Sequence, residues 1–185
     1  MRRSLVLAVL VACGPTPMGE MGNPGEAGPM GTMGTQGPPG PGSMVKEVTS
    51  TGQLVVGAST TTFTLIPGLA TTVAVPAGTV LNVRTDGGMQ CTGTGNAFSA
   101  IDVAIFIDGL ETTAARRVVA ANTVGVAQII TNWSFGRTFV VTPGAHTIEV
   151  RAVSAGGGGV DANVSSGSAP QLQGVLAATL LQPIP

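Results

Sequence analysis

Short stretches in which apolar and polar residues alternate run through most of the chain after residue 43. A period of two is typical of β-strands that bury one face, and Val and Thr, which favour strands, are abundant here. The pattern predicts strands over residues 53–56, 60–66, 71–75, 80–85, 90–92, 98–107, 117–120, 124–133, 137–141, 147–153, 161–165 and 174–181. So many short strands predict an all-β sandwich or barrel.

Tight turns should separate these strands, because Gly, Pro and Asp recur between them at short intervals. No segment shows a persuasive helical stripe, although residues 111–121 could hold one turn of helix. The turn signals are Pro67-Gly68, Pro76-Ala77-Gly78, Asp86-Gly87-Gly88, Asp108-Gly109 and Pro143-Gly144.

Two segments resemble each other in sequence, namely residues 76–84 (PAGTVLNVR) and 143–151 (PGAHTIEVR). Each combines a proline, a small turn, apolar alternation and a final arginine. We expect each to begin a strand directly after a turn, with Leu81 and Val83, or Ile148 and Val150, facing inward. Such a pair suits two related halves of a sandwich.

Two strands break the alternation, because residues 103–107 and 175–181 are almost apolar on both faces. One face of an antiparallel sandwich normally meets water. A strand that is apolar on both sides therefore needs a second cover. We favour another subunit as this cover, and a cover from within the same chain is the alternative.

Composition and charge exclude some function classes. Charged residues make up 9% of the 185 residues and the net charge is −1, so neither a nucleic-acid interface nor a polybasic membrane contact is expected. The 43% of hydrophobic residues is enough to form a core.

The first residues, MRRSLVLAVLVAC, have the layout of a secretory signal peptide. The last four, LVAC, resemble the lipobox of bacterial lipoproteins. This resemblance implies a signal peptide over residues 1–12, a lipidated N-terminus over residues 13–18, and acylation of Cys13. Gly14 follows the cysteine, which gives the outer membrane a weak preference. The alternative is an ordinary cleaved signal with Cys13 as an incidental thiol.

Glycine recurs at every third position over residues 19–42, from Gly19 to Gly40, and five prolines occupy positions between the glycines. A collagen triple helix needs this spacing because only glycine fits at its axis. Eight triplets would extend over only about 70 Å at the roughly 3.1 Å rise per residue of such a helix. So short a segment should wind only if something adjacent holds three chains together, and a flexible spacer that never winds is the alternative.

A Gly-X-Y stalk followed by a β-rich head over residues 44–185 resembles the bacterial collagen-like surface lipoproteins. The phrase PGAHTIEVRA at residues 143–152 is similar to a penultimate-strand pattern of their heads. The resemblance implies a C1q/TNF-like jelly-roll head that forms a homotrimer, with its last strand near the three-fold axis. The chain departs from the family in having few aromatic residues, with no Tyr and five Phe.

Candidates for chemistry are few. His146 is the only histidine, and we expect it to be a satisfied residue at the sandwich edge; a Ser-His-Asp arrangement with Asp102 or Asp161 is formally possible but lacks a nucleophile motif. Scattered Asp residues and two cysteines predict no metal site and no cofactor. Trp133 and Cys91 are expected to be buried, with Met89 and Cys91 on one strand face; an interchain bond through Cys91 is the alternative.

The sequence therefore predicts a non-enzymatic, lipid-anchored, trimeric protein of the cell surface with a structural or adhesive role. Its partners would be two further copies and the membrane that holds the lipid, without nucleic acid. The alternative function is a recognition head that binds a glycan or a host protein through its loops.

Overall fold

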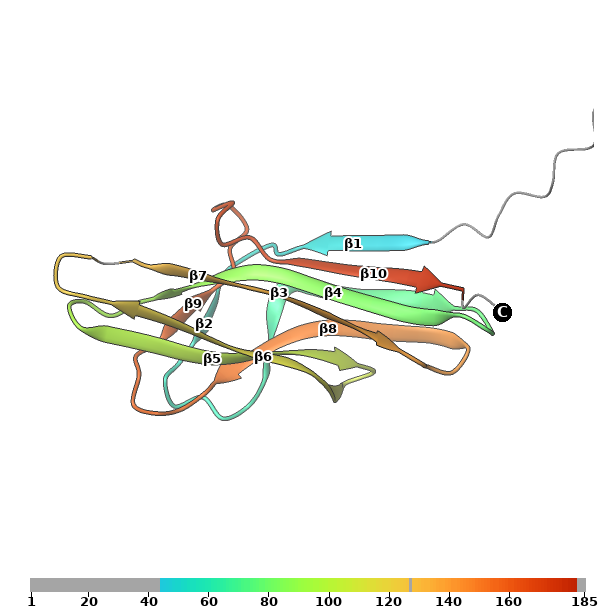
Figure 1. Ribbon diagram of the computed structural model, residues 1–185, viewed down its shortest axis with the longest axis horizontal. Coiled ribbons are helices and arrows are strands. Elements are labelled where there is room, and N and C mark those ends of the chain that lie inside the picture. The colour runs from blue at the N-terminus through green and yellow to red at the C-terminus, as the bar shows by residue number, and fades with distance from the viewer. Residues whose placement is uncertain (1–43, 127, 183–185) are drawn as a thin grey trace, which may run out of the picture. The chain divides into compact units, whose positions relative to one another are not determined.

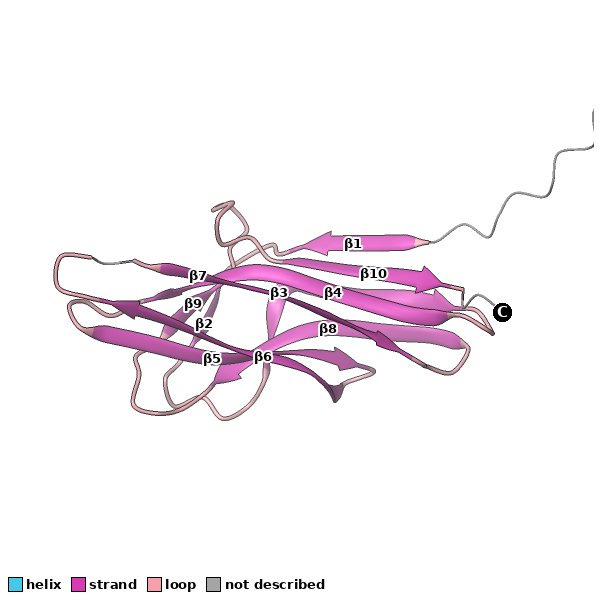
Figure 2. Ribbon diagram, viewed as in Figure 1, coloured by secondary structure: helices cyan, strands magenta, loops and turns pink. Residues whose placement is uncertain are grey.

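A computed structural model describes residues 44–126 and 128–182, which form ten strands and no helix (Figures 1 and 2). The strands are β1 (Val45–Thr49), β2 (Leu54–Val56), β3 (Thr64–Val75), β4 (Val80–Cys91), β5 (Ala97–Ile107), β6 (Leu110–Asn122), β7 (Ile130–Phe139), β8 (Gly144–Ser154), β9 (Ala162–Val164) and β10 (Val175–Leu181). The expectations for residues 1–12, 13–18 and 19–42, Cys13 included, lie outside the described residues.

Two antiparallel sheets pack face to face as a jelly-roll sandwich, which confirms the predicted fold class (Figure 1). The first sheet has the order β1-β10-β4-β9-β2, with β7 paired along β4, and the second has the order β3-β8-β5-β6. The connections from β2 to β5 and from β6 to β9 cross between the sheets, so β4, β7 and β10 lie in one layer while β3, β5 and β8 lie in the other.

The core lies between the sheets and is built from the inward positions of both. Leu81 and Val83 of β4 and Ile148 and Val150 of β8 are fully buried, as the two similar segments predicted. Met89 and Cys91 are also buried on one face of β4, as expected.

The predicted turn at Asp86-Gly87-Gly88 is wrong, because β4 continues through it without interruption. These glycines serve close packing instead of a turn. A Cβ at Gly87 would overlap the indole ring of Trp133, and a Cβ at Gly88 would lie 2.9 Å from the carbonyl oxygen of Gln171. The sequence signal was therefore real, but it marked crowding from other segments.

Other strand boundaries also differ from the predicted ones. The segments 60–66 and 71–75 belong to the single strand β3, in which Pro67-Gly68 falls within a register shift between Leu65 and Ala70. Residues 111–121 lie in β6 and form no helical turn. The expected strand over residues 124–133 begins only at Ile130, and β1 was not predicted.

The outer face of β5 is covered by the same chain. Ala104 is fully buried and Phe106 is 6% exposed, although both point away from the core. The ring of Phe63 meets Phe106 edge-on at 5.2 Å, and the Arg151 guanidinium lies 4.7 Å from the Phe106 ring centre. The expected subunit interface at residues 103–107 is therefore wrong for this strand, because the internal cover is the one observed.

Candidate functional site

Along β10, no segment of the described residues covers the outer face of the first sheet, although residues 171–172 lie over Gly88 further along β4. Val175, Ala177 and Thr179 of β10 point to this face and are half-buried, while Leu176 and Leu180 are buried on the opposite side. β1 and β4 flank β10, and β7 continues the surface beyond β4. We call it the β10 face; it comprises Val45, Glu47, Val80, Asn82, Arg84, Asp86, Ser134, Gly136, Thr138, Val175, Ala177, Thr179 and Leu181.

Small side chains alternate with longer polar ones in the middle of the β10 face. Ala177 lies opposite Arg84, which in turn lies opposite Gly136, and Thr179 lies opposite Asn82. The face is low at Ala177, Gly136 and Thr179, whereas the Arg84 side chain between them is well exposed. Two-sided apolar strands such as β10 are unusual when one side meets water.

One end of the β10 face is apolar. Leu181 pairs with Val80, and Val45 pairs with Thr179 one row further in. Met44 and Val140 at the same end are 62% and 89% exposed. The β1 strand begins and β10 ends at this apolar end (Figure 1). Clustered exposed apolar residues of this kind mark interaction surfaces.

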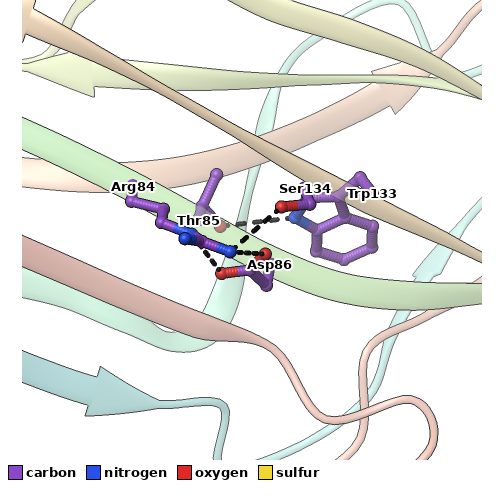
Figure 3. Close-up of polar contacts among 5 residues, drawn as sticks. All are labelled: Arg84, Thr85, Asp86, Trp133 and Ser134. Carbon is purple, nitrogen blue, oxygen red and sulfur yellow. Dashed lines mark hydrogen bonds and ion pairs between the residues drawn. The ribbon is translucent and has the colours of Figure 1, made fainter.

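A charged pair lies on the β10 face (Figure 3). Arg84 Nε and Nη2 donate to the two carboxylate oxygens of Asp86 at 3.1 and 3.3 Å, and Nη2 lies 3.4 Å from Ser134 Oγ. The hydrogen bonds to Asp86 and its negative charge raise the pKa of Arg84. The fork-like pairing neutralises both charges on the surface that a partner would meet.

Trp133 belongs to the core under this face and takes no part in the surface. It is 3% exposed, and its Nε1 donates to the buried Thr85 Oγ1 at 3.3 Å (Figure 3). The predicted burial is confirmed. An exposed Trp133 would have favoured a site where a sugar stacks on the indole ring, but the ring is buried and cannot serve in this way.

His146 is buried and satisfied, as predicted. Its Nδ1 lies 2.7 Å from Asp108 Oδ2, and its Nε2 lies 2.7 Å from the carbonyl oxygen of Thr142. Asp108 Oδ2 and the Thr142 carbonyl oxygen are both acceptors, so both ring nitrogens of His146 can donate only when the imidazole is protonated. The hydrogen bonds to Asp108 and Thr142 raise the pKa of His146, and those from His146 and Thr147 lower the pKa of Asp108.

The acidic residues considered with His146 are used elsewhere. Asp102 accepts two hydrogen bonds from Arg117, each at 2.9 Å, and Asp161 Oδ1 accepts one from the Ala58 amide. Neither carboxylate contacts His146. Among the described residues, no three His, Cys, Asp or Glu side chains are grouped to hold a metal ion. Within residues 44–126 and 128–182, no helix could cross a bilayer.

Sequence reasoning found β10 but missed what surrounds it. The strand β1 carries too little alternation to be predicted, and the neighbours of β10 come from segments far apart in sequence. The exposed Val140, three residues before Pro143, was the available signal for the apolar end, since an apolar residue near a turn is otherwise costly to expose.

No protein-family profile matches the chain, and no curated protein matches it in sequence. In structure it is similar to the infectious bursal disease virus VP2 subviral particle, at 16% identity and a TM-score of 0.42, covering 74% of this chain and 32% of that one. It is also similar to the T13 viral particle of the same virus, at 14% identity and a TM-score of 0.41, covering 74% and 31%. The chain thus spans about a third of the length of these proteins, and the likeness transfers no function.

Proposed function

We propose that this protein is a non-enzymatic, lipid-anchored homotrimer of the bacterial cell surface. Its jelly-roll head would be displayed on a short collagen-like stalk for a structural or adhesive role. The C1q/TNF-like resemblance of residues 143–152 and the Gly-X-Y segment at residues 19–42 motivate the proposal.

The uncovered β10 face is the observation that carries the proposal. Its centre combines small side chains with the Arg84–Asp86 ion pair, and its end is apolar. A second and a third copy of this chain are the proposed cover. The outer face of β5 needs no such partner because Phe63 and Arg151 already cover it.

The sequence before the head supports three copies in particular. A collagen helix contains three chains, and the Gly-X-Y run ends at residue 42, two positions before Met44 at the apolar end. Association of three heads through this end would bring three stalks together at high effective concentration. The short stalk could then wind, although it is too short to do so alone.

The mass of residues 44–185 in solution tests the proposal. We expect a trimer at micromolar concentration by sedimentation equilibrium. A monomer there would remove the mechanism that gathers the stalks. Circular dichroism of residues 13–185 should show a cooperative collagen transition at low temperature that residues 44–185 lack.

The anchor has a separate test. Two or three acyl chains anchor a protein firmly, since each buried CH₂ contributes about 0.8 kcal/mol. We expect Cys13→Ala to abolish incorporation of a labelled fatty acid, with Cys91→Ala as the matched control that leaves it unchanged. Unchanged labelling of Cys13→Ala would exclude the proposed anchor.

A further inference from the structure

A hollow of 220 Å³ lies at the end of the sandwich opposite the apolar end of the β10 face. It forms where β7 separates from β4: the two strands pair as far as Gln90 with Ile130, and beyond that point Gln128 diverges from residues 91–94. Residues from three segments line the hollow, namely Gln90, Cys91, Thr92, Gly93, Thr94, Gln128 and Asn163.

A buried side chain fixes the width of this hollow. Asn122 Nδ2 donates to the carbonyl oxygen of Gly93 at 2.7 Å and lies 3.4 Å from that of Cys91, while its Oδ1 accepts from the Ile129 amide at 3.1 Å. Asn122 is 3% exposed and connects the two separating strands. The hollow is therefore preformed, and the carbonyl groups of Cys91 and Gly93, which an added peptide strand would need, are already in contact with Asn122.

Three of the residues that line the hollow, Gln90, Gln128 and Asn163, have amide side chains. Gln90 and Asn163 are direct cross-strand neighbours, and Gln128 lies across from them. None of the three amides makes a side-chain hydrogen bond within the described part of the chain. Gln128 also has a φ of 61°, which is uncommon for a residue other than glycine and clusters at binding sites.

None of the residues that line the hollow carries a formal charge. The nearby Asp161 contacts Thr92 through its main-chain carbonyl oxygen, and its carboxylate accepts a hydrogen bond from the Ala58 amide. The sequence has no charged residue between Asp86 and Asp102 or between Arg117 and Arg137, and these stretches supply most of the lining. Amides and hydroxyls both donate and accept hydrogen bonds, as sugar hydroxyls do. A charged ligand would find no counter-charge here, and the hollow lacks the apolar anchor pocket that peptide side chains use.

We propose that this hollow binds a neutral saccharide, with Gln90, Asn163 and Gln128 as the residues that recognise its hydroxyl groups. Its volume lies below the roughly 300–1,000 Å³ of pockets that enclose drug-sized ligands, so it takes one sugar ring, such as the end of a longer chain. Because the lining contains no aromatic ring for a sugar to stack on, a single hollow should bind the sugar weakly, with a dissociation constant of about 1 mM.

A glycan array with the full-length protein tests the proposal, in a detergent that has no sugar head group. We expect saturable binding to a subset of neutral oligosaccharides that added salt does not weaken, because no ion pair is involved. Saturation-transfer NMR with millimolar methyl glycosides of the same terminal sugars should show contact in solution.

Variants locate the site. Gln90→Ala and Asn163→Ala should each weaken binding about two- to tenfold, the range for one or two lost hydrogen bonds. Gln173→Ala removes an exposed amide elsewhere and should change nothing. Unchanged thermal melting would show that the variants remain folded.

Several outcomes would overturn the proposal. The first is that the folded protein binds no neutral glycan. The second is that it binds only acidic glycans or peptides. The third is that Gln90→Ala and Asn163→Ala leave glycan binding unchanged. The mass of the head is measured independently, so a monomer that binds sugar would refute the trimer alone, and a trimer that binds none would refute this site alone.

Discussion

The two outer faces of the sandwich are closed in different ways. On the second sheet, Phe63 and Arg151 lie over Phe106, and Glu149 holds Arg151 through a 2.6 Å bond between its Oε2 and Arg151 Nη2. On the first sheet, no segment of the described chain covers Ala177 and its neighbours. Strands β5 and β10 are both apolar on two faces in sequence, yet only β10 has an outer face that the described residues leave uncovered.

The comparison shows what a doubly apolar strand can and cannot reveal. Such a pattern states that a second cover exists, because exposing both faces to water is unfavourable. It does not state whether the cover comes from the same chain. Phe63 lies more than forty residues before Phe106 in sequence, so their contact depends on the completed fold. Mutations that act on one face should therefore change stability, and those on the other should change assembly.

The largest expected effect is on the closed face. Phe106→Ala removes a ring that is 6% exposed and leaves Phe63 and Arg151 without their partner. Deleting a buried Phe typically costs about 3–5 kcal/mol of unfolding free energy. Urea denaturation of residues 44–185 should show this loss.

Phe98→Ala is the matched control for this substitution. Phe98 lies on the same side of β5 but is 37% exposed, so its replacement should cost clearly less. Equal losses at both positions would mean that the contact with Phe63 and Arg151 does not close this face.

The open face should respond in assembly instead of folding. Ala177→Arg places a long cation at the centre of the β10 face, opposite Arg84. We expect the proposed trimer to dissociate at least tenfold more readily, which corresponds to about 1.4 kcal/mol, with little change in the melting of the monomer. Sedimentation at several concentrations measures this, with Ala121→Arg on the outer side of β6 as the control that leaves the mass unchanged.

The sequence predicted the local features well and the non-local ones poorly. Alternation identified β8 and apolar runs identified β5 and β10, and Asp108-Gly109 forms the expected turn with φ values of 52° and 77°. Gly87 was misread because its neighbour Trp133 comes from another strand. The hollow beside Gln90 was not predicted either, because it needs β4, β9 and the segment before β7 to meet.

Next in size is a pH effect at one end of the second sheet. His146 holds Asp108 and Thr142 together, and its raised pKa means that the folded state binds the proton more tightly. This contribution to stability is fully present below about pH 6.5 and is lost as the pH rises through the raised folded-state pKa. The lowered pKa of Asp108 adds stability above about pH 4, which is lost as the pH falls further.

Melting temperatures measured across this range should therefore be highest between the two limits. His146→Gln should flatten the alkaline side of the profile, because no proton is then released. Asp108→Asn should move the alkaline loss to lower pH, since the main cause of the raised His146 pKa is removed. A profile of His146→Gln that matches the unmodified protein would show that another group titrates.

The smallest effect compares two similar ion pairs, one on each outer face. Asp102 pairs with Arg117 beside the closed face, and Asp86 pairs with Arg84 on the open one. Both arginines are well exposed in a single chain, so Asp102→Asn and Asp86→Asn should each change the melting of the monomer only slightly. If a second copy covers the β10 face, Asp86→Asn also leaves Arg84 without its partner in a desolvated interface, which is much more costly. The trimer of Asp86→Asn should then dissociate more readily than that of Asp102→Asn, and equal dissociation of the two variants would place the Arg84 pair outside the interface.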